Sequence, residues 1–386
     1  MSEKNGRRAG HEKSPRKQWL FLGTGIVVLA LTSIVLFIKF DTAAAANLTD
    51  QFLRPMIGDN QVISLEGIFF NISDAINQIE YRFIKPTNSF ISSDSVAIVA
   101  TGTAAQSSTL DLAPLSVVSG SASTSEGVWR NIPLSLFPGS IVLADTFVHP
   151  DPTRPYALVT LVQMDMSQLR LWSVAGTQEP GGKVGKPGPG VVPQNIQTQG
   201  TLVAAFDGGF QYRDGQYGMV VGSTTYLPLK NDLATLVGYS NGSLAIVKYE
   251  GQSLGNNISF IRQNCPMLIE NGIIETQNEA NRKLWGRTIT SSIYTWRSGI
   301  GVTAKGNLIF AIGNSLVPST LAAALASAGA VNAMQLDINL YWVRFNIFND
   351  YSNGAYAHST VMSGVFDGAY NYLHGYQKDF FYVTKK

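Results

Sequence analysis

The chain has 386 residues, and its formal charge of +2 hides an uneven distribution of charged side chains. Residues 1–40 hold seven Lys or Arg and two Glu, which leaves 21 basic and 24 acidic residues in the rest of the chain. This slightly acidic remainder lacks the basic patch that nucleic-acid binding requires, so we expect no nucleic-acid partner. The single Cys265 excludes an intrachain disulfide.

An apolar run over residues 19–38 has about the length that crosses a bilayer. Basic side chains precede it, which predicts a cytoplasmic tail over residues 1–18 and an extracytoplasmic remainder. We therefore expect a single-pass protein of the cell membrane whose partner is the lipid bilayer. A cleaved signal peptide is the alternative, because alanines at 43–46 suit a signal peptidase. The run exceeds an ordinary signal core of about 7 to 15 residues, which favours an anchor.

Residues 41–126 are expected to connect the anchor to a folded domain. Between residues 68 and 83, apolar side chains recur at spacings of three and four, which predicts an amphipathic juxtamembrane helix. Its apolar face could pack on protein or lie on the lipid surface. Residues 88–126 are rich in Ser, Thr, Ala and Gly, and this composition indicates a spacer.

The folded domain is predicted to span residues 127–386 and to begin with a series of strands. Strand patterns occur at residues 141–148, 156–164, 169–174 and 201–206. Proline and glycine at 179–190 predict a surface loop between two of them. Turn sequences between strand-like flanks predict four hairpins, at residues 212–218, 240–243, 270–273 and 304–307.

One helix is predicted over residues 319–328, where Pro318 and a Ser or Thr cap introduce an alanine-rich run. An alternating stretch at residues 331–336 follows as a strand. Many hairpins with few helices predict an α+β fold, with a mainly antiparallel or mixed sheet preceded by one transmembrane helix.

Residues 206–210 read FDGGF, and residues 266–272 combine a proline with a hairpin turn. These two segments resemble the Asn-Gly-Gly-Phe element and the proline-then-hairpin segment of the phosphodiester glycosidase family. Residues 295–310, the alanine-rich helix and Gln335-Leu336-Asp337 then follow in the family's order. The resemblance covers roughly residues 128–383. It implies a hydrolase that cleaves a sugar from a phosphodiester-linked glycan or cell-envelope polymer, with a glycan or sugar phosphate as substrate.

Such a reaction needs a carboxylate as base or nucleophile, together with cationic or amide donors for the phosphate. Asp337, at the carboxyl end of a predicted strand, is the first candidate for the carboxylate, and a turn aspartate is its alternative. Asp207 replaces the family's asparagine and adds a second acidic group. His358 is a candidate proton carrier, although a structural histidine is the alternative.

Four residues are candidates for substrate binding. Arg297 resembles the arginine before the family's Gly-Val-Thr strand and could hold a phosphate, or else form an ion pair in the core; Arg287 and Arg344 are weaker candidates. Gly208 and Gly209 allow a tight turn with exposed amides. Asn339 could orient a hydroxyl, form a turn, or complete a site for a divalent cation such as calcium with Asp337.

The chain departs from the family at its glycine-rich run. The usual Asp-Gly-Gly-Gly-Ser appears here as Asp337-Ile338-Asn339-Leu340-Tyr341, so bulky side chains replace the glycines that let backbone amides approach a phosphate. This departure supports a second hypothesis. The chain would then be a catalytically inactive family member that acts as a carbohydrate-binding or surface interaction domain.

Overall fold

A computed structural model describes residues 56, 78–79, 96–97, 108–116, 125–181, 186–276, 279, 284–286, 294–362 and 364–386. The chain divides into two compact units, Met1–Val62 and Ile63–Lys386. None of the helices in the described ranges is long and apolar enough to cross a membrane. The predicted span at residues 19–38 and most of the predicted juxtamembrane helix lie outside those ranges.

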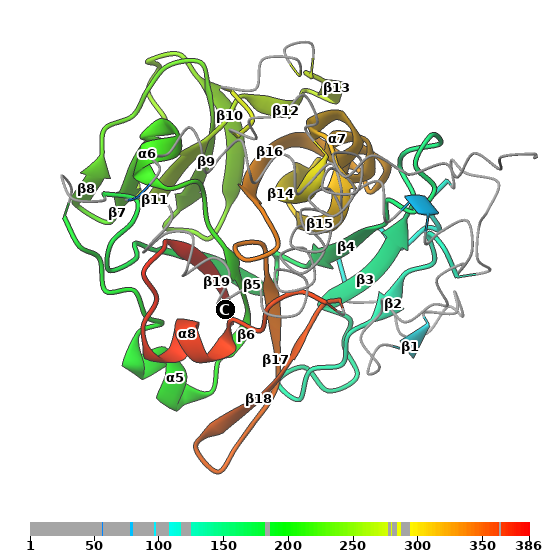
Figure 1. Cartoon of the computed structure of the whole chain (residues 1–386). Helices are drawn as coiled ribbons and strands as arrows, with labels where there is room; N and C mark the ends of the chain where they lie inside the picture. Colours follow the sequence, from blue (N-terminus) through cyan, green and yellow to red (C-terminus); the bar gives the residue numbers. More distant parts are fainter. Residues whose placement is uncertain are drawn as a thin grey trace, which may run out of the picture. The chain divides into compact units, whose positions relative to one another are not determined.

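The described residues of the second unit form three sheets (Figure 1). The nine-stranded sheet has the order β1 (Val96–Ala97), β2 (Arg130–Asn131), β3 (Leu143–Val148), β4 (Val159–Met164), β15 (Leu308–Leu316), β14 (Thr295–Thr303), β16 (Ala330–Ile338), β12 (Met267–Glu270), β13 (Ile273–Ile274). A five-stranded sheet has the order β10 (Leu244–Tyr249), β9 (Leu233–Tyr239), β11 (Ile258–Asn264), β7 (Met219–Val221), β8 (Thr224–Leu227). A second five-stranded sheet has the order β18 (Ala355–Thr360), β17 (Phe345–Ser352), β6 (Leu202–Asp207), β19 (Phe380–Lys385), β5 (Leu169–Val174).

Every strand pairing among the described residues is antiparallel, which confirms the predicted mainly antiparallel fold. The helices of the described ranges are α5 (Gln194–Gln199), α6 (Tyr212–Gly215), α7 (Pro318–Ser327) and α8 (Ala369–His374). Since α7 occupies the predicted position of the alanine-rich helix, that prediction is confirmed as well.

The main core contains apolar side chains from all three sheets. Phe206 of β6 lies near its centre, with ring centroids 5.1 Å from Phe310 of β15 and 5.4 Å from Phe345 of β17. Burying aromatic rings of this size makes a large contribution to stability. Asp207 follows Phe206 directly in the chain, so a carboxyl group lies at the end of β6, immediately next to the core.

Helix α7 packs against the nine-stranded sheet and fills a second core (Figure 1). Leu321 and Leu325 of this helix are fully buried over Gly299 of β14. A Cβ at Gly299 would lie 3.0 Å from the Met334 carbonyl oxygen and 3.1 Å from Leu321 Cδ2, so a larger residue would push the helix away. A third cluster joins the β5–β6–β17–β19 sheet to α8 through the buried Tyr372.

Turn chemistry predicted three hairpins correctly and one incorrectly. The turns at 240–243, 270–273 and 304–307 connect β9 to β10, β12 to β13, and β14 to β15. The segment 212–218 does not form a hairpin, because Tyr212–Gly215 form α6. A distant residue contributes to this, because Glu179 Oε2 accepts a 2.7 Å hydrogen bond from the Tyr212 amide at the helix start. Gln216 then ends the turn at φ 53°.

Residues 108–116, which the sequence places in the spacer, pack on the folded region. The Thr109 amide and hydroxyl donate to the Asp165 carboxylate at 3.1 and 2.7 Å, and Asn307 Nδ2 donates to the Thr109 carbonyl oxygen. Leu110 is buried beside them. Part of the Ser- and Thr-rich segment therefore contributes to the packed structure ahead of residue 127.

Candidate active site

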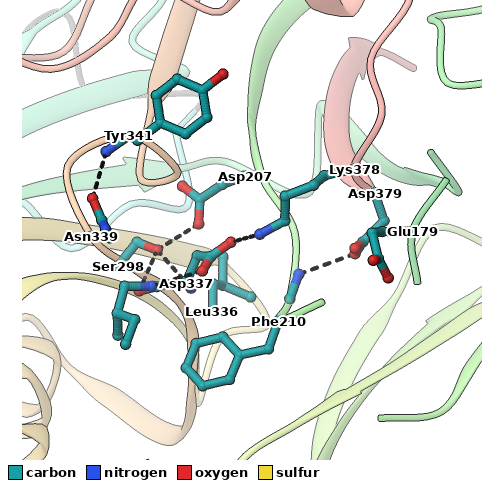
Figure 2. A network of polar contacts seen from close by, with 12 residues as sticks. Glu179, Asp207, Phe210, Ser298, Leu336, Asp337, Asn339, Tyr341, Lys378 and Asp379 are labelled. Carbon is teal, nitrogen blue, oxygen red and sulfur yellow. Dashed lines mark hydrogen bonds and ion pairs between the residues drawn. The ribbon is translucent and has the colours of Figure 1, made fainter. Parts of the chain in front are cut away.

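Two aspartates from different sheets meet at one serine (Figure 2). Ser298 Oγ of β14 donates a 2.5 Å hydrogen bond to Asp207 Oδ2 at the end of β6. The same oxygen accepts a 3.0 Å hydrogen bond from the amide of Asp337 in β16. The structure thus brings the two predicted carboxylates together, and it adds a serine that the sequence did not single out.

A bulge in β16 turns Asp337 toward this cluster. Arg297 pairs with Ile338 and Gly299 pairs with Gln335, so two residue steps of β14 face three steps of β16. Such an extra residue re-aims the side chains beside it. Asn264 satisfies carbonyl groups that the bulge displaces, because its Nδ2 donates to the backbone oxygens of Gln335 and Leu336 at 3.0 and 2.5 Å.

Lys378 forms an ion pair with Asp337. The lysine lies in the loop between α8 and β19, is 2% exposed, and contacts Asp337 Oδ2 through Nζ. Its ammonium group also lies 4.5 Å from the ring centroid of Trp342. Burial of both partners means that little solvent screens their attraction.

A second buried ion pair holds the Gly208-Gly209 turn. Arg262 donates to Asp379 through Nε at 2.8 Å and Nη2 at 3.1 Å, and the Gly209 amide donates to Asp379 Oδ2 at 3.0 Å. Arg262 Nη2 also donates to the Phe210 carbonyl oxygen at 3.0 Å. Because Asp379 already accepts the Gly209 amide, this donor is not directed at a ligand, and the predicted substrate contact of these glycines stays a prediction.

Both positions of the turn require glycine. A Cβ at Gly208 would lie 2.2 Å from Asp379 Oδ2, and a Cβ at Gly209 would lie 2.5 Å from Arg262 Nη2. The glycines therefore let a buried salt bridge approach the backbone closely.

Burial raises the pKa values of the two carboxyl groups. Burial and the neighbouring Asp337 carboxylate raise the pKa of Asp207 to about 7. Burial also raises the pKa of Asp337, to about 6, although the Lys378 ammonium opposes this change. One carboxyl group can thus hold a proton near neutral pH while the other is ionised, which is the condition for acid and base roles at one site.

Arg344 is the arginine next to Asp207. Its backbone amide donates to Asp207 Oδ1 at 2.9 Å, and its Nη2 donates to the Tyr341 carbonyl oxygen at 2.7 Å. The guanidinium carbon lies 5.0 Å from the ring centroid of Tyr376. The sequence patterns favour Arg297 over Arg344 as a phosphate ligand, yet the structure places Arg344 nearer to Asp207.

Arg297 points away from the carboxylates. Neighbouring residues of a strand project to opposite faces, and Ser298 is the one that faces Asp207. Arg297 Nε donates to the Leu316 carbonyl oxygen at 2.9 Å, and Nη1 donates to the Trp285 carbonyl oxygen and to Gln335 Oε1. These contacts engage the guanidinium group with carbonyl and amide oxygens of the core, and both the predicted contact with phosphate and the alternative ion pair stay predictions.

Asn339 and His358 lie outside the carboxylate cluster. Asn339 adopts φ 79°, and its Oδ1 accepts a 3.1 Å hydrogen bond from the Tyr341 amide, which favours the turn alternative. His358 lies on the β17–β18 hairpin, which projects from its sheet (Figure 1). Its Nε2 is 2.9 Å from Asp367 Oδ2, and both side chains are partly exposed.

The described part of the chain contains no group of three or more His, Cys, Asp or Glu side chains that could hold a metal ion. Beside Asp337, the Lys378 ammonium already takes the position of a neutralising cation. The donor set therefore does not fit the divalent cation that the sequence allowed.

Sequence reasoning missed Ser298, Lys378, Asp379, Arg262 and Asn264. Two signals could have indicated all of these except Ser298. The charged pair Lys378-Asp379 stands directly before the apolar strand β19, and the polar run Arg262-Gln263-Asn264 ends β11, whose first residues are mostly apolar. Polar residues in segments that the sequence pattern predicts to be buried usually have hydrogen-bonding or ionic partners inside the protein.

Residues 200–337 match the family model of the phosphodiester glycosidases. The resemblance predicted from the sequence is therefore confirmed for the segment that carries Asp207, Ser298 and Asp337. Lys378 and Asp379 lie beyond the matched segment. A comparison with curated proteins gives no match.

Two solved structures are similar to this chain at low identity. The zebrafish N-acetylglucosamine-1-phosphodiester alpha-N-acetylglucosaminidase catalytic domain, auto-inhibited by its pro-peptide, is 12% identical with a TM-score of 0.40, over 67% of this chain and 88% of that chain. A hypothetical protein from Synechocystis is 11% identical with a TM-score of 0.35, over 64% of this chain and 63% of that chain. Superpositions this loose do not align individual residues, so no residue role passes from them to this chain.

Proposed function

We propose that the protein is a membrane-anchored, extracytoplasmic hydrolase that cleaves a sugar from a phosphodiester-linked glycan or cell-envelope polymer. The observation that carries the proposal is the meeting of Asp207 and Asp337 at Ser298, inside the segment that matches the phosphodiester glycosidases. The anchor and the location rest on the apolar run at residues 19–38 and its basic flank.

The two carboxylates suit different roles in such a reaction. Asp337, held ionised by Lys378, would either take a proton from the water that attacks the sugar carbon or attack that carbon itself, with water then hydrolysing the intermediate. Asp207, which keeps a proton to higher pH, would donate a hydrogen bond to the leaving oxygen. A phosphate is already a good leaving group, so this assistance need only be weak.

Substrate entry requires a movement of the protein. Asp207 and Asp337 are 2% and 3% exposed, so a sugar cannot reach them in the closed arrangement. The half-buried Tyr341 and Trp342, on the connection between β16 and β17, lie next to the cluster. Displacement of this connection is the step that would admit the substrate, as lid movements do in other enzymes.

The direct test compares hydrolysis of sugar-phosphate diesters by the wild type, Asp337→Ala and Asp337→Asn. The asparagine variant keeps the side-chain volume, and Glu250→Gln, which alters an exposed carboxylate, is the matched control. Removal of a base or nucleophile is expected to lower turnover at least about 10²-fold, whereas the control keeps the wild-type rate. Equal turnover in the wild type and both Asp337 variants would remove Asp337 from the mechanism.

A catalytically inactive carbohydrate-binding or surface interaction domain is the second candidate. The absence of the glycine run and the buried pairing of Asp337 with Lys378 favour it, because both features reduce the freedom of the carboxylate. Saturable glycan binding without release of sugar would support this candidate over the enzyme.

A further inference from the structure

Arg344 is a buried arginine without a carboxylate partner in the described part of the chain. It is 3% exposed, and the ion pairs of the described residues do not include it. Nη2 donates to the Tyr341 carbonyl oxygen, but the buried Nε finds no acceptor among the described residues. Burying a guanidinium group without an anion is unfavourable, so this arrangement calls for a negatively charged ligand.

A second donor without an acceptor lies beside it. The hydroxyl of Tyr372 is fully buried and has no hydrogen-bond partner among the described residues. Arg344 and Tyr372 both border Gly368, where an added Cβ would lie 2.6 Å from Arg344 Cδ and 3.0 Å from Tyr372 Cε2. Tyr376 covers the guanidinium face, with its ring centroid 5.0 Å from Arg344 Cζ. The donors without an acceptor among the described residues are thus Arg344 Nε, at the edge of the guanidinium group, and the Tyr372 hydroxyl.

The charges around Arg344 are consistent with a missing anion. Arg262 is balanced by Asp379, and Lys378 is balanced by Asp337. Asp207 is the carboxyl group left for Arg344, and it already accepts hydrogen bonds from Ser298 and from the Arg344 amide. Whenever Asp207 carries a proton, the Arg344 guanidinium group has no ionised carboxylate partner among the ion pairs of the described residues, and a phosphodiester with its single negative charge would supply one.

We infer that Arg344 and Tyr372 form an anion-binding subsite that takes the phosphoryl group of the substrate, through Arg344 Nε and the Tyr372 hydroxyl. A guanidinium group suits this task because its planar donors match phosphate oxygens. The inference rests on the proposed function where it names the phosphoryl group as part of a substrate. It also explains how a phosphate is held although Arg297 is engaged by backbone carbonyl groups.

Two variants of the full-length chain test the subsite, with dimethyl phosphate and inorganic phosphate as probes in titration calorimetry. Tyr372→Phe removes a hydroxyl that has no hydrogen-bond partner among the described residues, so the thermal unfolding midpoint is expected to stay the same or rise. Arg344→Lys keeps the charge and removes Nε. Each variant is expected to weaken binding of both probes at least about tenfold. Arg170→Gln, which removes a guanidinium group placed over Trp172, is the control and keeps the wild-type affinity.

Unchanged affinity in both variants, or no binding of either probe to the wild type, overturns the subsite. These outcomes are separable from failure of the proposed function. Suppose that the wild type binds the probes, that the variants weaken this binding, and that no sugar is released from any diester. The subsite is then supported and the hydrolase activity is contradicted. If sugar is released and Tyr372→Phe leaves the KM for the diester unchanged, the hydrolase activity is supported and the subsite is contradicted.

Discussion

Ser298 and Asp207 are joined by a 2.5 Å hydrogen bond although they belong to different sheets. Because Ser298 Oγ also accepts the Asp337 amide, one hydroxyl group links the strand end of β6 to the bulge in β16. The relative position of the two carboxylates therefore depends on this small side chain as well as on the packing of the core.

Ser298→Ala is expected to destabilise the fold and shift the titration of Asp207. The variant leaves a buried carboxylate oxygen and the buried Asp337 amide without their partner, which should lower the free energy of unfolding by about 1–3 kcal/mol. The serine hydrogen bond lowers the pKa of Asp207 against the larger effect of burial, so its loss should raise that pKa further. Urea unfolding and carboxylate titration by NMR measure the two effects.

The control for this prediction is Ser240→Ala, because Ser240 donates to the Asn257 carbonyl oxygen at an exposed position. Its loss is expected to change the free energy of unfolding by no more than about 0.5 kcal/mol. Equal effects of the two substitutions would mean that the Ser298 bridge adds nothing to the stability of the fold.

Asp207→Asn is expected to flatten the dependence of stability on pH. The folded-state pKa of about 7 lies above the ordinary value of 3.8, so the folded protein holds this proton more tightly than the unfolded chain does. The resulting stabilisation is present below about pH 4 and is lost as the pH rises through 7. Asparagine cannot lose the proton, so the variant should gain stability relative to the wild type over this interval, by up to about 1.4 kcal/mol for each pKa unit.

Unfolding free energies at pH 5 and pH 8 measure this difference. Asp337 contributes a smaller slope of the same sign in both proteins, since its pKa is raised to about 6. Parallel pH curves of the wild type and Asp207→Asn would contradict the prediction, because they would mean that folding does not raise the pKa of Asp207.

Local patterns predicted three hairpins and α7 because their causes are local. Asn241-Gly242 and Asn271-Gly272 supply backbone conformations that a tight turn requires; Gly242 and Gly272 have φ values of 86° and 82°. Helix α7 combines Pro318 in its first turn with an alanine-rich run. The family motifs likewise led to Asp207 and Asp337, which the structure brings together.

The remaining site residues depend on contacts between distant parts of the chain. Lys378 is 41 positions from Asp337, and Arg262 is 117 positions from Asp379. No periodicity within one segment predicts such partners. The orientation of Arg297 depends on which face of β14 packs against α7, and that face is decided by the strand register.

Asp379→Asn is expected to destabilise the protein far more than loss of an exposed ion pair. The substitution leaves the Arg262 guanidinium buried without its carboxylate and weakens the acceptor of the Gly209 amide, so the free energy of unfolding should fall by about 3–5 kcal/mol. Lys248→Gln breaks the exposed contacts to Asp232 and Glu250 and should have no measurable effect. Similar midpoints of urea unfolding for the two variants would contradict this ranking.

Arg297→Lys separates a structural role from a role in substrate binding. The guanidinium group donates to the carbonyl oxygens of Leu316 and Trp285 and to Gln335 Oε1. A lysine ammonium group cannot reproduce this planar set of donors, so buried acceptors lose their partners. The variant is expected to lose about 2–4 kcal/mol of unfolding free energy, at about 1–3 kcal/mol for each buried group left without a partner.

The kinetics of Arg297→Lys also distinguish a structural role from a role in substrate binding. Because the side chain faces away from Asp207, the folded variant should bind and cleave a sugar phosphodiester with a KM within about twofold of the wild type, at a temperature well below its unfolding midpoint. A rise in KM of about tenfold or more without loss of stability would instead place the arginine on the phosphate, since tenfold corresponds to about 1.4 kcal/mol of binding free energy. That result would require β14 to present its other face to the substrate, and it would replace Arg344 with Arg297 as the phosphate ligand.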